Sequence, residues 1–210
     1  MYEGDESING DAATIYSNKR SNWGFSNTGY FMDDAVKSPV YKLTSTYSTE
    51  SLFSTARRAA ISLTYYGYCL ENGMYTVKLD FAEIQFTGDE LYKRVGKRFF
   101  DIYIQVIQIK LSKKIFFFYQ KDPFNLGFVF QGKLEEKDFN IEEAANGSNK
   151  ASIVFNANVT DTTLEIRLYW NGKGTTCIPE RGNYGPLISA ITVCSGMFYI
   201  YIPSISFESH

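Results

Sequence analysis

Histidine is almost missing from this 210-residue chain, since the one histidine is the last residue, His210. This excludes histidine-based general base catalysis and most zinc chemistry. The three cysteines, Cys69, Cys177 and Cys194, lack the spacing of metal ligands. An odd number of cysteines suggests a lost partner or a free thiol. The sequence therefore predicts no metal site and no cofactor.

Motifs of catalysis are missing as well. The sequence has no Ser/His/Asp combination, no glycine-rich phosphate loop, no protein-kinase signature string and no carboxylate pair at a recognisable spacing. The adjacent acids Asp33-Asp34, Glu135-Glu136 and Glu142-Glu143 are typical of a solvated surface. We therefore expect a protein that is not an enzyme.

Long apolar runs and strong net charge are also missing. No run of 18 apolar residues and no signal peptide occurs, so the sequence predicts no insertion of this chain into a membrane. The net charge of −2 gives no reason to expect a nucleic acid partner. Because residues 1–5 already look domain-like, we expect the natural N-terminus to lie further upstream.

What the sequence does have is aromatic residues, 17% of the chain, in alternating patterns. Over residues 71–88, Tyr75, Val77, Leu79 and Phe81 alternate with polar residues that would face solvent, which predicts a strand with one buried face. Similar strands are expected at 98–105, 132–141 and 164–170, the last with Leu164, Ile166 and Leu168 in the same core. Short strands with turn signals and no convincing helix predict a single all-β domain, an antiparallel β-sandwich.

Four blocks resemble one protein family, the malectin-like domains of plant leucine-rich-repeat receptor-like serine/threonine kinases. They are WGFSNTGYFMDD at 23–34, LFSTAR with SLTYYGYCL at 52–70, KLDFAEIQF at 78–86 and KGTTCIPERGNYGPLISAI at 173–191. The resemblance covers residues 2–105 and 132–194. It implies a jelly-roll sandwich similar to carbohydrate-binding modules, on the extracellular face of the plasma membrane in the full-length parent.

The resemblance also implies two functions. Animal malectin is a lectin whose sugar site uses loop tyrosines, a Tyr-Phe pair after the FAE strand and an aspartate before the last strand. Here the pair reads Gln85-Phe86 and the aspartate position falls near Tyr184. The partner of this chain is therefore expected to be a co-receptor or other protein, or alternatively a cell-wall or other neutral oligosaccharide.

Candidate sugar-binding residues are aromatic or amide side chains within or next to these blocks: Trp23, Tyr65, Tyr66, Phe86, Asn183 and Tyr184. For Trp23 a second interpretation remains open, in which Trp23 and Phe25 pack into the core at one end of the sandwich. Tyr65 and Tyr66 are expected to point to opposite faces, one toward the core and one toward a ligand. The sequons at Asn146 and Asn158 are candidate glycosylation sites.

The segment Val106–Gln131 interrupts the pattern. It holds four lysines, one acid and seven aromatic residues, of the kinds that A/T-rich DNA encodes. Its ends can be encoded by splice signals, and without it Gln105 would join Gly132 in a hairpin between two alternating strands. We interpret it as a retained intron; the alternative is a long functional loop. The predicted domain is 1–195, with 106–131 as an excursion, and 196–210 is expected to be a tail outside it.

Overall fold

The computed structural model describes residues 3–4, 13–18, 21–31, 42–44, 52–86, 95–106, 132–176 and 184–196. These residues form twelve strands and one four-residue helix. The elements in chain order are β1 (Ala13–Asn18), β2 (Trp23–Thr28), β3 (Lys42–Thr44), β4 (Thr55–Arg58), β5 (Ser62–Gly67), β6 (Gly73–Ala82), β7 (Phe100–Val106), β8 (Gly132–Phe139), α2 (Ile141–Ala144), β9 (Lys150–Val159), β10 (Leu164–Tyr169), β11 (Leu187–Ile188) and β12 (Ala190–Ser195). The predicted all-β class is confirmed.

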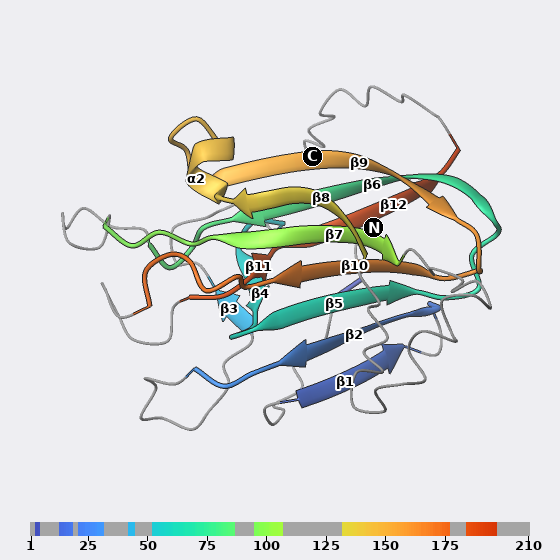
Figure 1. The fold of residues 1–210 in the computed structure, drawn as a ribbon, viewed down its shortest axis with the longest axis horizontal. Helices are drawn as coiled ribbons and strands as arrows, with labels where there is room; N and C mark the ends of the chain where they lie inside the picture. The colour runs from blue at the N-terminus through green and yellow to red at the C-terminus, as the bar shows by residue number, and fades with distance from the viewer. Residues whose placement is uncertain are drawn as a thin grey trace, which may run out of the picture.

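The strands form two layers. One is a six-stranded sheet in the order β1-β2-β5-β10-β7-β8, which lies toward the viewer in Figure 1. Behind it lie two three-stranded sheets, β12-β6-β9 and β11-β4-β3. All strand pairs that these sheets contain are antiparallel. The arrangement is the predicted antiparallel sandwich.

Strand β6 lies at the centre of the second layer, between β9 and β12. The side chains of Val77, Leu79 and Phe81 are fully buried, and Tyr75 is 8% exposed. From the other layer, Leu164, Ile166 and Leu168 join the same core cluster. Both predictions about the core are therefore confirmed, because alternation along a strand directs every second side chain to one face.

The opposite face of β6 differs from the prediction at one residue. Thr76 and Lys78 are half-buried, but Asp80 is fully buried although the alternation places it on the solvent side. The hydroxyl of Ser152 donates to the Asp80 carboxylate, and Lys78 Nζ lies 3.0 Å from Oδ1. Polar neighbours of this kind allow a carboxylate to be buried without becoming isolated.

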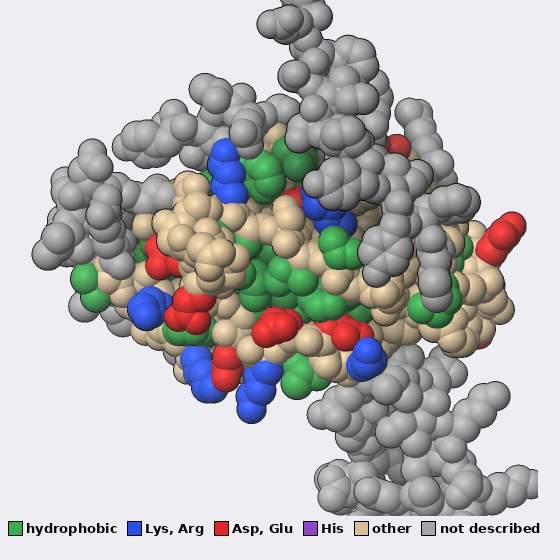
Figure 2. Space-filling view, turned by 90° about the horizontal axis from the view of Figure 1, so that it is seen from above, with side chains coloured by type: hydrophobic (Ala, Val, Ile, Leu, Met, Phe, Trp, Pro, Cys, Tyr) green, Lys and Arg blue, Asp and Glu red, His purple; other side chains and the backbone are tan. Residues whose placement is uncertain are grey.

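Strand β8 is the natural partner of β7, as the sequence predicts. The two strands pair antiparallel, and Val106 stands opposite Gly132 at the end of the ladder. At the outer edge of the sheet, β8 carries two lysines and three acids, and Nζ of Lys133 lies 2.8 Å from Oε1 of Glu135. Figure 2, which looks onto the edge of the molecule where β8 and β9 lie, shows such charges along one margin. Charged edges oppose pairing with a second chain.

Residues 107–131 and 197–210 lie outside the described residues, so the excursion and the tail stay predictions. We propose that Val106–Gln131 is an insertion in the domain. Deleting it should raise the soluble yield and the melting temperature, because Gln105 of β7 would be joined directly to Gly132 of β8, next to the pair Ile104 and Lys133, and seven aromatic residues would be removed. Expression trials and thermal unfolding of both forms measure this. A deletion variant that does not fold would contradict the proposal.

Candidate functional site

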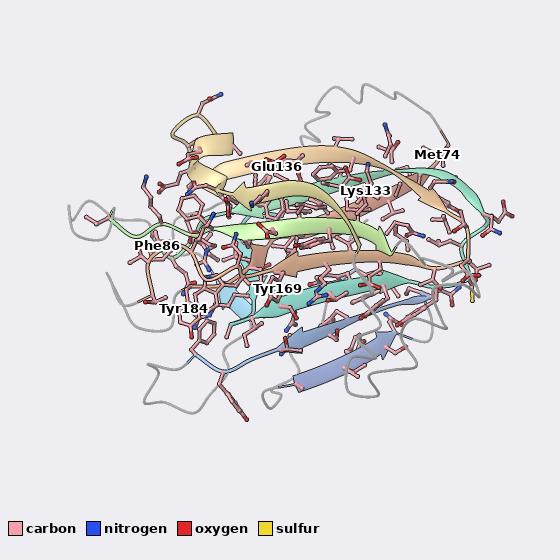
Figure 3. All side chains as sticks on the ribbon, in the orientation of Figure 1. Met74, Phe86, Lys133, Glu136, Tyr169 and Tyr184 are labelled. Atoms are coloured by element: carbon pink, nitrogen blue, oxygen red, sulfur yellow. The ribbon has the colours of Figure 1, made fainter. Side chains whose placement is uncertain are left out.

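The loop that follows β6 carries the first part of the candidate site. Phe86 lies in this loop at the same end of the sandwich as Tyr184, on the left in Figure 3. Oε1 of Glu83 accepts hydrogen bonds from the backbone N–H groups of Gln85 at 3.1 Å and Phe86 at 3.4 Å. The acid of the FAE block therefore fixes the turn that positions Phe86.

Arg98 joins this loop to Gly185, which lies just before β11. Its Nε donates to Glu83 Oε2 at 2.7 Å, and one terminal nitrogen donates to the carbonyl of Gly185 at 2.7 Å. The other terminal nitrogen donates to Gln85 Oε1 at 2.9 Å, and the guanidinium lies 5.2 Å from the Phe86 ring centroid. The ion-paired side chains are only 1% and 3% exposed. A planar guanidinium with several donors suits such a buried junction.

Tyr184 belongs to a small second core. Its ring centroid lies 4.6 Å from that of Trp170 and 5.1 Å from that of Phe31, the latter edge to face. Tyr184 and Phe86 are each only 3% exposed. The two rings lie at one end of the sandwich, and they face the interior in this structure. Neither ring therefore offers a face on which a sugar could stack without rearrangement.

A shallow depression lies beside Phe86, with about 170 Å³ of space that includes open solvent. The residues that line it are Glu83, Phe86, Gly96, Arg98, Asn140, Ile141 and Glu142. Burial, followed by the nearby Glu83 carboxylate, raises the pKa of Glu142 above its ordinary value. The depression is thus lined mainly by charged and polar residues, with Phe86 and Ile141 as its apolar side chains, which is not the lining expected for a stacked sugar.

Trp23 and Tyr65 contact each other on the core side of the six-stranded sheet. Together with Phe25 and Tyr16 they form an aromatic cluster whose ring centroids are 5.5–6.5 Å apart. The indole N–H of Trp23 donates to Glu3 at 2.8 Å. This placement supports the interpretation in which Trp23 and Phe25 pack into the core at one end of the sandwich.

Tyr66 points away from this cluster, so the paired tyrosines do lie on opposite faces of β5. Its ring lies 6.1 Å from that of Tyr68 at an interplanar angle of 12°. Of the six candidate residues, Tyr66 is therefore the one on the outer face of the six-stranded sheet, and Asn183 lies outside the described residues. Tyr68 was not among the sequence candidates, although its i+2 spacing from Tyr66 was a usable signal.

Both sequon asparagines are exposed. Asn146 follows α2 in a left-handed conformation with φ of 51°, and Asn158 lies near the end of β9 opposite Met74. The described cysteines, Cys69 and Cys194, are free and exposed, and Cys177 lies outside the described residues. Within the described ranges, no group of three His, Cys, Asp or Glu residues could hold a metal ion, and no helix is long and apolar enough to cross a membrane.

Comparison with known families decides the classification. The malectin domain matches residues 1–111 and 124–191 of this chain. The chain belongs to the malectin domain family. The gap inside the match, residues 112–123, lies within the segment that the sequence predicts to be an excursion.

The relatives of this malectin domain are plant receptor kinases. The probable LRR receptor-like serine/threonine-protein kinase At1g29720 of Arabidopsis thaliana is 48% identical over 92% of this chain. The similarly described RFK1 of the same plant is 46% identical over 93% of the chain. The chain spans only 17% of the length of each. Among solved structures, the plant receptor-like kinase FER is 16% identical with a TM-score of 0.47, covering 78% of this chain and 35% of FER.

Proposed function

We propose that this malectin domain is the extracellular recognition module of a receptor-like kinase and binds a ligand or partner protein without catalysing a reaction. The observation that carries the proposal is the match to LRR receptor-like kinases, which extends over more than 90% of this chain but only 17% of each kinase. A segment of this size corresponds to one module of a longer receptor.

Extracellular placement predicts N-glycosylation, which the exposed positions of Asn146 and Asn158 support. When the chain is secreted from plant cells behind a signal peptide, peptide N-glycosidase should increase its mobility on a denaturing gel. Asn146→Gln and Asn158→Gln should each remove one of two glycans, and the double variant should show no shift. A secreted wild-type chain without any shift would contradict this prediction.

Two classes of partner fit this module. The buried rings of Phe86 and Tyr184 leave no ring in that pair free for sugar stacking, so a protein partner is the first candidate for that end of the sandwich. The second candidate, a lectin for a neutral oligosaccharide, is supported by the parallel rings of Tyr66 and Tyr68 on the outer face of the sheet.

A binding experiment on plant protoplasts tests recognition and separates these two classes. Labelled chain should bind the cell surface saturably and be displaced by unlabelled chain. Loss of binding after trypsin treatment of the protoplasts indicates a protein partner, whereas displacement by free neutral oligosaccharides indicates a lectin. The absence of any saturable binding would contradict the proposed recognition function.

A further inference from the structure

The outer face of the six-stranded sheet gathers side chains from three central strands. The register places Tyr66 of β5 opposite Glu165 of β10, and Arg167 of β10 opposite Tyr103 of β7. Tyr169 follows on β10, near the middle of the sheet in Figure 3. We name this set the tyrosine face; its members are Tyr66, Tyr68, Tyr103, Glu165, Arg167 and Tyr169.

These side chains lie on the side of the sheet away from the core. The residues between them on β10, Leu164, Ile166 and Leu168, are at most 3% exposed and belong to the core cluster. All members of the tyrosine face are instead half-buried. Strand alternation therefore separates the two sets completely.

Small residues of β2 and β5 border the tyrosine face on one side. Gly24, Ser26 and Thr28 of β2 stand opposite Tyr66, Thr64 and Ser62 of β5, in that order. A Cβ at Gly24 would lie 3.4 Å from Cε2 of Tyr68 and would collide with the backbone of Tyr16. The glycine thus leaves room for the Tyr68 ring.

The polar groups of the tyrosine face are short of partners. Arg167 lies 5.0 Å from the Tyr169 ring centroid, and the Tyr103 hydroxyl donates a long hydrogen bond of 3.5 Å to Asp101. The side chains of Glu165 and Arg167 and the hydroxyls of Tyr66, Tyr68 and Tyr169 form no hydrogen bond or ion pair with the described part of the chain. None of these atoms is among the buried polar atoms without a partner in the described ranges, so water reaches them, and a ligand can replace those water molecules with its own hydrogen bonds.

Burial also changes the pKa values of several residues on the tyrosine face. It is the largest cause that raises the pKa of Glu165, while the nearby Arg167 acts in the opposite direction. Burial is also the first cause that raises the pKa values of Tyr68 and Tyr103. At neutral pH the hydroxyls of Tyr68 and Tyr103 are therefore protonated and can both donate and accept hydrogen bonds.

We propose that the tyrosine face binds a neutral oligosaccharide, whose sugar rings lie against the tyrosine rings while its hydroxyls bond to Arg167 and Glu165. The inference rests on the lectin candidate of the proposed function and gives it a site away from Phe86 and Tyr184. The ligand is expected to be neutral because Arg167 and Glu165 place opposite charges two residues apart on one strand. It is expected to be rich in hydroxyls because Arg167 only donates, the Glu165 carboxylate only accepts, and a sugar hydroxyl does both.

Isothermal titration with oligosaccharides tests the site. The probes are neutral gluco-, xylo- and manno-oligosaccharides of four to six sugars, with an oligogalacturonide as the acidic comparison. For the neutral sugar that binds best, Arg167→Gln and Tyr66→Ala should each lower the association constant about tenfold. Tyr66→Phe, which keeps the ring, should lose less. Lys133→Gln removes one positive charge from the edge strand of the same sheet and should leave binding unchanged.

The melting temperature of each variant shows whether it is folded. Equal sugar binding by the folded wild type, Arg167→Gln and Tyr66→Ala would overturn the tyrosine face while the lectin function stands. Binding of the oligogalacturonide alone would overturn the inference of a neutral ligand. If the wild type binds none of the sugars, both the lectin candidate and the tyrosine face are wrong. Recognition of a protein partner would then be judged by the protoplast experiment.

Discussion

Replacing Arg98 by methionine is expected to lower the free energy of unfolding by about 3–5 kcal/mol, the usual cost of breaking a buried ion pair from one side. The Glu83 carboxylate, whose side chain is only 3% exposed, would be left without its cation. The carbonyl of Gly185 would lose its donor as well. Urea unfolding with linear extrapolation measures the change, because a small single domain is expected to unfold in one transition.

The double variant Arg98→Met with Glu83→Leu separates charge from packing. It should be more stable than Arg98→Met alone, since an apolar pair leaves no unpaired buried charge. Lys133→Met provides the control, because the Lys133 side chain is 61% exposed and its pairing with Glu135 should contribute only about 0–1 kcal/mol. If Arg98→Met were as stable as Lys133→Met, the junction between the FAE loop and Gly185 would not hold the fold together.

Replacing Phe81 by alanine is expected to cost about 3–5 kcal/mol, the range for removing a large aromatic side chain from a core. The Phe81 ring is fully buried, with its centroid 5.7 Å from that of Phe100 and 4.9 Å from that of Phe139. These two partners belong to the other layer, so the substitution removes contacts that join the two sheets. The same urea titration measures the loss.

Met74→Ala on the same strand is the matched control. The Met74 side chain is 40% exposed, and substitutions at the surface usually change stability by no more than about 0.5 kcal/mol. A Phe81→Ala variant that matched Met74→Ala in stability would show that the cluster of Phe81, Phe100 and Phe139 is not a required contact between the layers.

Local patterns in the sequence were enough to assign several features correctly. The alternation of Tyr75, Val77, Leu79 and Phe81 identified the buried face of β6, because side chains on a strand alternate whatever the strand pairs with. The same rule placed Tyr65 and Tyr66 on opposite faces. The FAE block and the closing block led to the malectin family, which the family match confirms.

Burial that depends on distant residues could not be predicted this way. Asp80 alternates as a solvent-facing residue, yet Ser152, 72 residues away, donates to its carboxylate. Phe86 and Tyr184 look like loop aromatics, but Arg98 covers one and Trp170 the other. A local pattern indicates which face of a strand a side chain lies on, or that a residue lies in a loop. It does not indicate which residues of other segments will pack against that side chain.

The tyrosine face also depends partly on local alternation and partly on the tertiary structure. The sequence by itself determined that Tyr103 and Arg167 lie on the side of their strand opposite the buried residues, and that Tyr66 faces away from Tyr65, because side chains alternate along a strand. Only the tertiary structure decided that the three lie together, since the order β5-β10-β7 brings them side by side. Strand order in an antiparallel sandwich is set by long-range pairing and by how the two layers close their common core, and neither is encoded in the period of a single strand.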